Sequence, residues 1–377
     1  MADNKENKVL NVPALRFPEF TEEWNYESLD TIAPNITSGR SKPSLGEYNL
    51  YGSTGIIGKT ATADYSGDML LVARVGANAG SLQLVNDSCG ITDNTLIIKS
   101  CKLSSHYLYF YLQHYNLNRL VFGSGQPLIT AGMLKKVRIP FGNQLEQKKI
   151  ENFLCCIDER ITTQNKIIED LKKLKSAIVE MILCKQGGVL LKLGDVGSFI
   201  RGLTYSSEDI AEDINATTVI RANNLNYGNN VSKKDVVYVN KKPTEIQILR
   251  KGDIVICMAN GSSSLVGKNS YYSFDDRQST IGAFCGIYRS SQPLVKWLMQ
   301  SQRYRRLVYQ SLQGGNGAIA NLNGDDILNM TFYVVEDKKS VSILSALVLI
   351  ENSIAVNEKL QELYSMQKEY LLQHLFI

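Results

Sequence analysis

Two passages of this 377-residue chain nearly repeat each other, and this repeat constrains the fold more than any other feature of the sequence. Residues 123–141 read GSGQPLITAGMLKKVRIPF, and residues 314–332 read GGNGAIANLNGDDILNMTF. Other landmarks recur in the same order. A Gly-Asp pair before a strand-like run returns after 185 residues, RLVF returns as RLVY after 187, and the last apolar positions return after 193. The sequence therefore predicts two related modules of about 190 residues each.

A long segment with a heptad pattern follows each copy of the repeat. Its apolar residues are spaced alternately four and three apart, which is typical of a helix with a coiled-coil seam. Polar residues interrupt both seams at equivalent places, and such layers cost stability but exclude slipped pairings. The first seam is Ile150, Leu154, Ile157, Ile161, Gln164, Ile168, Leu171, Lys175, Ile178 and Ile182, and the second is Ile343, Leu347, Ile350, Ile354, Asn357, Gln361, Tyr364, Lys368, Leu371 and Leu375.

These patterns predict an α+β protein with two strand-rich globular modules, related by internal duplication and joined by two long helices. The first helix is expected to begin at a cap on Asn143, with Glu146 three residues on, and to stop at Gly187-Gly188. Because each helix is apolar on one stripe only, each needs a partner. We expect an antiparallel pair with one module at each end, a dumbbell with an approximate two-fold axis. Two alternatives stay open: the seams pack onto their own modules, or they drive homodimerisation.

The composition is that of a soluble protein, with 44% hydrophobic and 21% charged residues. No run reaches the ~18 apolar residues needed to span a bilayer, and the first residues lack the apolar core of a signal peptide. We therefore expect no membrane segment and a cytoplasmic location. The seven cysteines form no C-x-x-C pair and there are three histidines, which favours reduced core cysteines over disulfides or a zinc site. The net charge of +4 permits a nucleic-acid partner without requiring one.

Two related modules at a fixed separation suit double-stranded DNA, whose half-sites are read by two-fold related modules. The loops between predicted strands are rich in groups that read base edges and phosphates: Arg can fork to guanine, Asn and Gln to adenine, and small residues let backbone amides approach phosphate. The modules differ most in these loops, which predicts an asymmetric, split target. Alternatively, the turns simply need Asn, Gly and Ser. The candidate DNA-binding residues are Arg40, Lys42, Tyr51, Ser53, Thr54, Lys59, Arg74, Asn78, Ser124, Gln126, Arg201, Tyr205, Arg221, Asn223, Asn224, Asn260, Ser262, Lys268, Asn316 and Asn321.

No catalytic motif is found. The stretch YGSTGIIGKT at 51–60 misses the phosphate loop G-x-x-x-x-G-K-[ST], because Ser53 stands where a glycine is needed. The three histidines are scattered and leave Ser-His-Asp, Cys-His and H-E-x-x-H arrangements without a candidate. The Pro-Pro-aromatic signature of DNA amino-methyltransferases is missing, since no Pro-Pro occurs. We expect a chain that is not an enzyme.

Four stretches of the chain are similar to a known family: NVPALRFPEFTEEW, GDMLLVARVGANAGSLQLVNDSCGITDNTLII, QPLITAGMLKKVRIPFGNQLEQKKIENFL and the terminus KEYLLQHLFI. Over essentially its whole length, the chain resembles the specificity subunit of type I restriction-modification enzymes. The most specific part is the passage through a Gln-rich turn into the long helix. Two departures are visible. Phe141-Gly142 stands where the family usually has Pro-Pro, and YVVEDKKSVSIL in the second copy lacks both prolines and the Glu-Gln step.

The resemblance implies target-recognition domains at 1–145 and 187–335, and long spacer and docking helices at 146–186 and 336–377. In that family the helices dock two modification subunits, which are adenine-N6 methyltransferases that use S-adenosylmethionine. Two restriction subunits, driven by ATP with Mg, can add translocation and cleavage. The implied partners of this chain are double-stranded DNA and these subunits, with no membrane and no cofactor or metal in the chain itself.

Two rival functions from other classes stay open. The chain could be a pure interaction scaffold whose coiled coil organises partners while the modules bind peptide or glycan. Salt-dependent DNA binding by the assembled complex would argue against this scaffold. It could also be a nuclease or methyltransferase with an unrecognised active site, which the missing motifs argue against.

Overall fold

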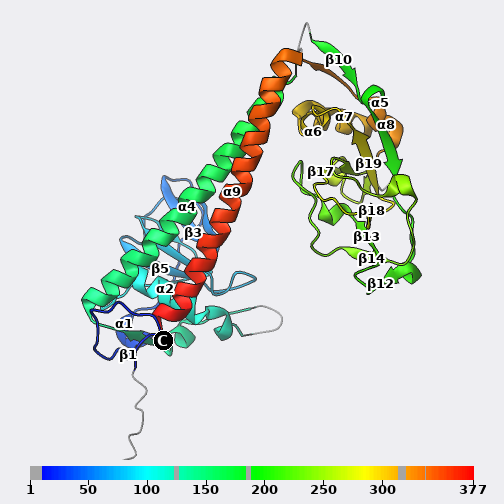
Figure 1. Cartoon of the computed structure of the whole chain (residues 1–377). Coiled ribbons are helices and arrows are strands. Elements are labelled where there is room, and N and C mark those ends of the chain that lie inside the picture. Colours follow the sequence, from blue (N-terminus) through cyan, green and yellow to red (C-terminus); the bar gives the residue numbers. More distant parts are fainter. Residues whose placement is uncertain (1–10, 123–126, 184–187, 313–319, 336) are drawn as a thin grey trace, which may run out of the picture. The chain divides into compact units, whose positions relative to one another are not determined.

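The structure is a computed structural model that describes residues 11–122, 127–183, 188–312, 320–335 and 337–377. The chain divides into two compact units, which we call unit 1 (residues 1–166 and 358–377) and unit 2 (residues 167–357). Each unit combines one strand-rich module with a stretch of both long helices (Figure 1). The two units do not coincide with the predicted order of module, helix, module and helix. Each long helix is divided between the units, because its seam packs against both modules.

Unit 1 contains two sheets, a two-stranded ribbon and several short helices, all of which precede the first long helix along the chain. The ribbon pairs the strand before the sheets with the strand after them, and so closes the module. The four-stranded sheet is β2 (Thr37–Ser38), β8 (Thr95–Ile98), β5 (Asp68–Ala73) and β6 (Leu82–Asn86); the three-stranded sheet is β4 (Gly55–Thr60), β3 (Tyr48–Gly52) and β7 (Gly90–Ile91); the ribbon is β1 (Asn25–Ser28) with β9 (Arg138–Phe141). The helices are α1 (Leu29–Ile32), α2 (Ser105–Tyr115), η1 (Leu117–Leu120), α3 (Ala131–Lys135) and α4 (Gln144–Met181).

Unit 2 repeats this plan with additional short elements. Its ribbon also joins the first and last strands of the module. The sheets are β11 (Gly197–Arg201), β19 (Cys285–Ser290), β15 (Ile254–Cys257) and β17 (Asn269–Tyr271), then β12 (Ile210–Ala211), β14 (Val237–Val239), β13 (Thr217–Ile220) and β18 (Ser279–Ile281), with ribbons β10 (Val189–Lys192)–β21 (Thr331–Val334) and β16 (Ala259–Asn260)–β20 (Ala320–Asn321). The helices are α5 (Leu193–Val196), η2 (Ser207–Asp209), η3 (Ala222–Asn224), η4 (Glu245–Gln247), η5 (Ser263–Leu265), α6 (Val295–Leu298), α7 (Gln302–Leu312), α8 (Gly324–Leu328) and α9 (Asp337–Leu375).

The two units share one strand order. The order β2-β8-β5-β6 corresponds to β11-β19-β15-β17, and the parallel pair β3–β7 corresponds to β13–β18. The central strands are apolar on both faces because each separates two cores. In β5, Leu70 and Val72 enter one hydrophobic cluster while Met69 and Leu71 enter another. In β15 the residues likewise alternate between two clusters. This agreement supports the internal duplication inferred from the sequence.

Both heptad seams are covered along their length, since every seam residue is buried or half-buried. In unit 1, Ile150 and Leu154 of α4 share a core with Leu371 and Leu375 of α9 and with the module. In unit 2, Ile182, directly after the end of α4, shares a core with Leu347 of α9 and the second module. The seams therefore pack on each other and on the modules at once. The expected helix pair and the alternative, in which each seam packs onto a module, occur together.

Two ion pairs join α4 to α9 across the seams. In unit 2, Lys175 Nζ lies 3.2 Å from Glu351 Oε1, and in unit 1, Lys368 Nζ lies 2.6 Å from Asp158 Oδ1. Burial lowers the pKa of the Lys175 ammonium, and Glu351 opposes this shift. In unit 1, Asp158 meets Lys368 while the later Arg160 stacks on the earlier Tyr364, which makes the two helices antiparallel there.

The start of α4 corrects one detail of the prediction. Asn143 does cap the helix, because its Oδ1 accepts a hydrogen bond from the Glu146 amide at 2.9 Å. Glu146, however, does not complete a capping box. Its fully buried carboxylate accepts two hydrogen bonds from Arg16, at 2.7 and 2.9 Å, and one from the Trp24 indole at 3.0 Å. A Cβ on Gly142 would lie 2.0 Å from this carboxylate, which explains why glycine follows Phe141.

The end of α4 also differs from the expected stop at Gly187-Gly188. The helix ends at Met181, since the chain after it pairs with the last strand of the module. Leu183 forms a β-bridge with Val334, and the Val335 amide donates to the Ile182 carbonyl at 2.9 Å. These contacts take the backbone out of the helix before residue 186.

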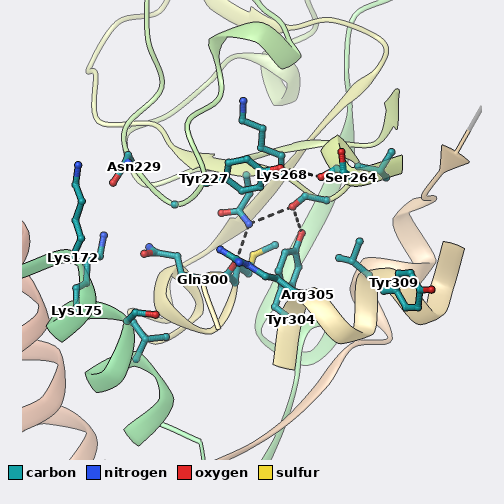
Figure 2. Close-up of a pocket in the computed structure, with 18 of the residues that line it drawn as sticks. Lys172, Lys175, Tyr227, Asn229, Ser264, Lys268, Gln300, Tyr304, Arg305 and Tyr309 are labelled. Carbon is teal, nitrogen blue, oxygen red and sulfur yellow. Dashed lines mark hydrogen bonds between the residues drawn. The ribbon is translucent and has the colours of Figure 1, made fainter. Parts of the chain in front are cut away.

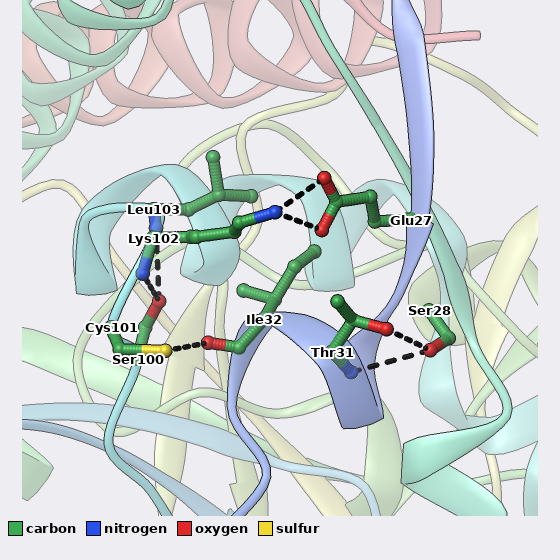
Figure 3. Close-up of polar contacts among 8 residues, drawn as sticks. All are labelled: Glu27, Ser28, Thr31, Ile32, Ser100, Cys101, Lys102 and Leu103. Atoms are coloured by element: carbon green, nitrogen blue, oxygen red, sulfur yellow. Dashed lines mark hydrogen bonds and ion pairs between the residues drawn. The ribbon is translucent and has the colours of Figure 1, made fainter.

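A polar network ties the start of the first module to the segment before α2 (Figure 3). Ser28 caps α1 by accepting from the Thr31 amide, and Lys102 donates to both carboxylate oxygens of Glu27 at 2.6 Å. The Cys101 thiol donates to the Ile32 carbonyl at 3.1 Å. Unlike Glu146, both members of the Lys102–Glu27 pair are partly exposed.

The helix α9 is more apolar than the sequence argument allowed. Over Ser340–Leu375 it is long and apolar enough, by length and composition, to cross a membrane, although one such helix is weak evidence for a span. Its seam residues lie in the cores of the units, while other apolar residues are exposed. These are Val341, Val348, Leu349, Val356, Leu363, Met366 and Tyr370.

Removing the buried carboxylate at the start of α4 should destabilise unit 1. We expect Glu146→Ala to cost about 3 kcal/mol, because it removes the carboxylate that pairs with the half-buried Arg16 guanidinium and leaves the buried Trp24 indole N–H without its acceptor. The matched control is Glu27→Ala, which removes a partly exposed carboxylate and should cost about 1 kcal/mol or less. Urea-induced unfolding of the two variants measures both values. Equal losses would contradict the role given to Glu146.

Candidate nucleic-acid interface

Four loops of unit 1 meet at one end of its sheets. The Gly39 amide donates to Thr95 O at 3.0 Å, the Ser53 hydroxyl to Asn94 O at 3.2 Å, and the Arg74 amide to Asn94 O at 2.9 Å. These bonds bring residues 39–42, 52–55, 74–78 and 92–94 together, and we call them loop cluster 1. It contains the predicted candidates Arg40, Lys42, Ser53, Thr54, Arg74 and Asn78.

Loop cluster 1 holds polar atoms that the protein does not satisfy. Arg74 Nε, Thr92 Oγ1 and Thr95 Oγ1 are buried and have no hydrogen-bond partner in the described part of the chain. Buried polar groups almost always have a partner, so an exception marks a place where a ligand can supply one. Arg40 and Lys42 are exposed beside these groups and add positive charge.

The equivalent loops of unit 2 surround a cavity of about 420 Å³. We call residues 201–205, 221–223, 259–262 and 282–284 loop cluster 2. The cavity is lined by four predicted candidates, Tyr205, Arg221, Asn223 and Asn260, and by Phe284. In both clusters, the loop that contains a glycine after the first sheet strand lies against the backbone of another loop. A Cβ on Gly39 would lie 2.3 Å from Ile91 O, and one on Gly202 would lie 2.1 Å from Gly282 O.

Arg221 has the same character as Arg74. Its Nε is buried without a partner among the described residues, while its Nη2 donates to the Asp235 carbonyl at 3.2 Å. The Arg221 amide donates to Asn224 Oδ1 at 2.9 Å, and Asn224 Nδ2 donates to the Lys234 carbonyl at 2.7 Å. The side chain of Asn224 is thus buried and shapes the loop through both ends of its amide. It does not line the cavity of loop cluster 2.

The remaining candidates divide by position. Arg201, at the end of β11, and the exposed Ser262 belong to loop cluster 2 but do not line its cavity, and Asn321 of β20 pairs with Ala259. Tyr51 is half-buried under loop cluster 1, where burial and then the charge of Asp87 raise the pKa of its hydroxyl. The candidates Ser124, Gln126 and Asn316 lie outside the described residues.

Two predicted residues lie away from the loop clusters. Lys59 sits on β4 opposite Asn49, and its Nζ donates to Glu47 O and Asn49 Oδ1, each at 3.0 Å, so it fastens the far end of the hairpin. Lys268 lies in a different cavity of unit 2. Neither residue joins the groups that the four loops bring together.

Three residues that the sequence reasoning missed belong to the clusters. Thr92 and Asn94 follow β7 directly, and Phe284, 68% exposed, occupies the equivalent loop after β18. The available signal was the repeat itself, since the polar turn ITDNT and the turn IGAFC both precede the central-sheet strand of their module. A single exposed aromatic in a reading loop offers a surface for stacking on a base or packing on a thymine methyl group.

The described residues of the two clusters offer hydrogen-bond donors and acceptors. Cys285 lines the cavity, yet burial raises the pKa of its thiol to about 12, so it remains protonated at neutral pH and is a poor nucleophile. Among the residues that the structure describes, no three His, Cys, Asp or Glu side chains gather as a metal site would require. The chemistry available to both clusters is hydrogen bonding, stacking and charge.

Comparisons with known proteins point to one family. Residues 9–173 match the family model of the type I restriction modification DNA specificity domain. The EcoKI specificity subunit of Escherichia coli (strain K12) is 28% identical over 164 residues, which cover 42% of this chain and 35% of that one. The MjaVIII specificity subunit of Methanocaldococcus jannaschii is 25% identical over 209 residues, 48% of each. The chain thus spans a third to a half of the length of the curated relatives it matches.

Solved structures show that the fold is shared over nearly the whole chain. The S subunit of a type I restriction-modification system from M. genitalium aligns with a TM-score of 0.66 at 17% identity and covers 97% of this chain and 99% of that one. A chain from a structural study of complex assembly in the type I system aligns with a TM-score of 0.53 at 14% identity, over 93% and 96%. Residues 9–173 are therefore similar to the type I restriction modification DNA specificity domain, and the chain shares the α+β fold of a solved type I S subunit over nearly its whole length.

Proposed function

We propose that this chain is the non-catalytic specificity subunit of a type I restriction-modification complex and reads a split, asymmetric DNA target, one half-site with each unit. The observation that carries the proposal is the pair of loop clusters at equivalent ends of the two units, each with a buried guanidinium Nε that has no partner among the residues described. Arg forks to guanine edges in the major groove, and its five donors gain most where they are desolvated.

The different side chains of the two clusters support an asymmetric target. Loop cluster 1 offers Arg40, Arg74 and Asn78, whereas loop cluster 2 offers Tyr205, Arg221 and Asn223. The supporting strands keep one order in both units, so the frame is repeated while the reading groups change. A change of loops in one unit would then alter only half of the target.

The long helices would dock two adenine-N6 methyltransferase subunits. Their seams are covered within each unit, but Leu174, Met181 and Leu349 stay 47–67% exposed on the outer faces. Exposed apolar residues of this kind mark a protein contact. S-adenosylmethionine would bind in those subunits, and ATP with Mg in two restriction subunits. The chain itself would hold no cofactor and would act in the cytoplasm.

Placing recognition in a separate chain has a physical rationale. A methyltransferase must flip its target adenine out of the stack, which costs a few kcal/mol. A subunit that fixes the enzyme over one adenine in each half-site adds the selectivity that the catalytic subunit lacks. The helices would then set the spacing between the half-sites.

Co-expression with a candidate modification subunit tests the proposed function. We expect sequencing of host DNA to reveal N6-methyladenine in a single split, asymmetric motif, methylated on both strands and absent without this chain. A stable complex with an active methyltransferase but no new methylation would overturn the proposal. It would favour the alternative, a coiled-coil scaffold whose modules bind peptide or glycan.

Arg221 should contribute to the reading of one half-site only. We expect Arg221→Gln to weaken binding of the assembled complex to its motif by about tenfold or more, because one bidentate contact is worth ~1–3 kcal/mol. Fluorescence anisotropy at fixed salt measures the affinity. The control is Arg250→Gln, which removes the same charge from an exposed position before β15, at the other end of that strand. Equal weakening by both variants would show a loss of overall charge instead of a specific contact.

A further inference from the structure

Unit 2 has a second cavity, of about 690 Å³, that the DNA-reading loops do not explain. Lys172 and Lys175 project toward it from α4, and Tyr304, Arg305 and Tyr309 border it on α7 (Figure 2). The segments around Tyr227 and Lys268 form its other walls. Its size lies within the range of sites for small molecules and cofactors.

The cavity is strongly basic. Its lining contains Lys172, Lys175, Lys268 and Arg305 and no Asp or Glu. Lys175 pairs with Glu351, which lies outside the lining. Lys268 and Arg305 have no ion pair among the residues that the structure describes. Lys268 and Arg305 thus add two positive charges that no carboxylate of the lining offsets, so the ligand of this cavity should be negatively charged.

The charged ends of two cations converge on one aromatic ring. Lys268 Nζ lies 5.3 Å and Arg305 Cζ 6.0 Å from the centre of the Tyr227 ring. The ring is held in place because the Tyr227 hydroxyl donates to the Ser264 carbonyl at 2.9 Å. The backbone of Tyr227 has φ 22°, an uncommon conformation for a residue with a side chain. Such strained residues concentrate at ligand sites.

The uncharged lining suits a planar, partly apolar group. Tyr227 and Tyr309 are 52% and 64% exposed, so their rings are available for stacking. Gln300 and Asn229 supply amides that can pair with the edge of a base, and Val179, Val266 and Met299 supply apolar surface. We propose that this cavity binds a nucleotide, with the phosphate at Lys268 and Arg305 and the base against the tyrosine rings.

The equivalent surface of unit 1 keeps Lys368 in place of Lys175 but lacks the other three cations, which argues against a contact for a repeated subunit. Gly80 and Gly267 correspond, both with positive φ, and at the same separation of 187 residues Ser81 replaces Lys268 and Asn118 replaces Arg305. At the helix separation of 193 residues, Ser365 replaces Lys172. Two identical partners docked on the two units would need the same groups twice. A single ligand per chain needs them once.

The nucleotide could be free in solution or be an unpaired residue of a DNA strand, since both present a phosphate and a base. This inference goes beyond the proposed function and does not rest on it. A chain that fails to direct methylation could still bind AMP, and a chain that directs methylation could still fail to do so.

Isothermal titration calorimetry of the full chain with AMP, and separately with an unlabelled oligothymidine, tests the inference. We expect one binding site per chain for at least one of the two probes. Arg305→Gln should weaken that binding about tenfold, the loss expected for one charge-assisted hydrogen bond. Binding of AMP would identify a site for free nucleotides, and binding of the oligonucleotide alone would identify a site for a strand.

The matched control is Arg306→Gln, because Arg306 is the next residue of α7, is exposed and does not line the cavity. Its affinity should equal that of the unaltered chain, and circular dichroism melting should show both variants folded. Lys268→Gln provides a second variant on another wall. The inference is overturned if neither probe binds at millimolar concentration, if Arg305→Gln and Arg306→Gln behave alike, or if only an acidic peptide binds in an Arg305-dependent manner.

Discussion

Each long helix has one lysine in its apolar seam, and each lysine pairs with a carboxylate of the other helix. The packing of the helices, and of the modules on them, depends on these two ion pairs. Lys175 of α4 meets Glu351 of α9, and Lys368 of α9 meets Asp158 of α4. The two lysines are 193 residues apart in the sequence, and so are the two acids. A slip of either helix by one turn would leave a buried charge unpaired, which costs several kcal/mol. Apolar contacts hold the helices together, while these pairs select one register.

The same lysines also link the helices to the modules. Lys175 lies 5.3 Å from the Trp297 ring, and Lys368 lies 5.5 Å from the Phe110 ring, an equivalent position in the other unit. Together with the buried Glu146 at the start of α4, they anchor each module on its stretch of helix. The loop clusters occupy the end of a framework that is fixed in this way. Rigid support of this kind allows the loops of both clusters to vary without loss of the fold.

The loop clusters bear a cost that a purely structural protein would avoid. Arg74, Thr92 and Arg221 keep buried polar atoms without partners in the described chain. Substitution by an apolar residue at any of these positions would remove the unpaired polar atom. Hydrophobic side chains at these three positions would increase the stability of the fold, as the apolar residues of β5 and β15 do in the cores. Local rules broken at one place in both units indicate a function, and a DNA edge is rich in the acceptors that a guanidinium requires.

The sequence by itself determined the repeat, the strand-rich modules and both long helices, because heptad spacing and repetition are local patterns that one chain records directly. It also predicted four residues that line one cavity, Tyr205, Arg221, Asn223 and Asn260, and their contact with DNA stays a prediction. Only the tertiary structure decided which candidates act together. It buried Asn224, moved Lys59 and Lys268 away from the clusters, and brought in Thr92 and Phe284. It also ended α4 at Met181, since the strand that captures the following residues lies more than 140 positions away in the chain. Long-range pairing determines what a loop residue faces, and no periodicity within the loop reports it.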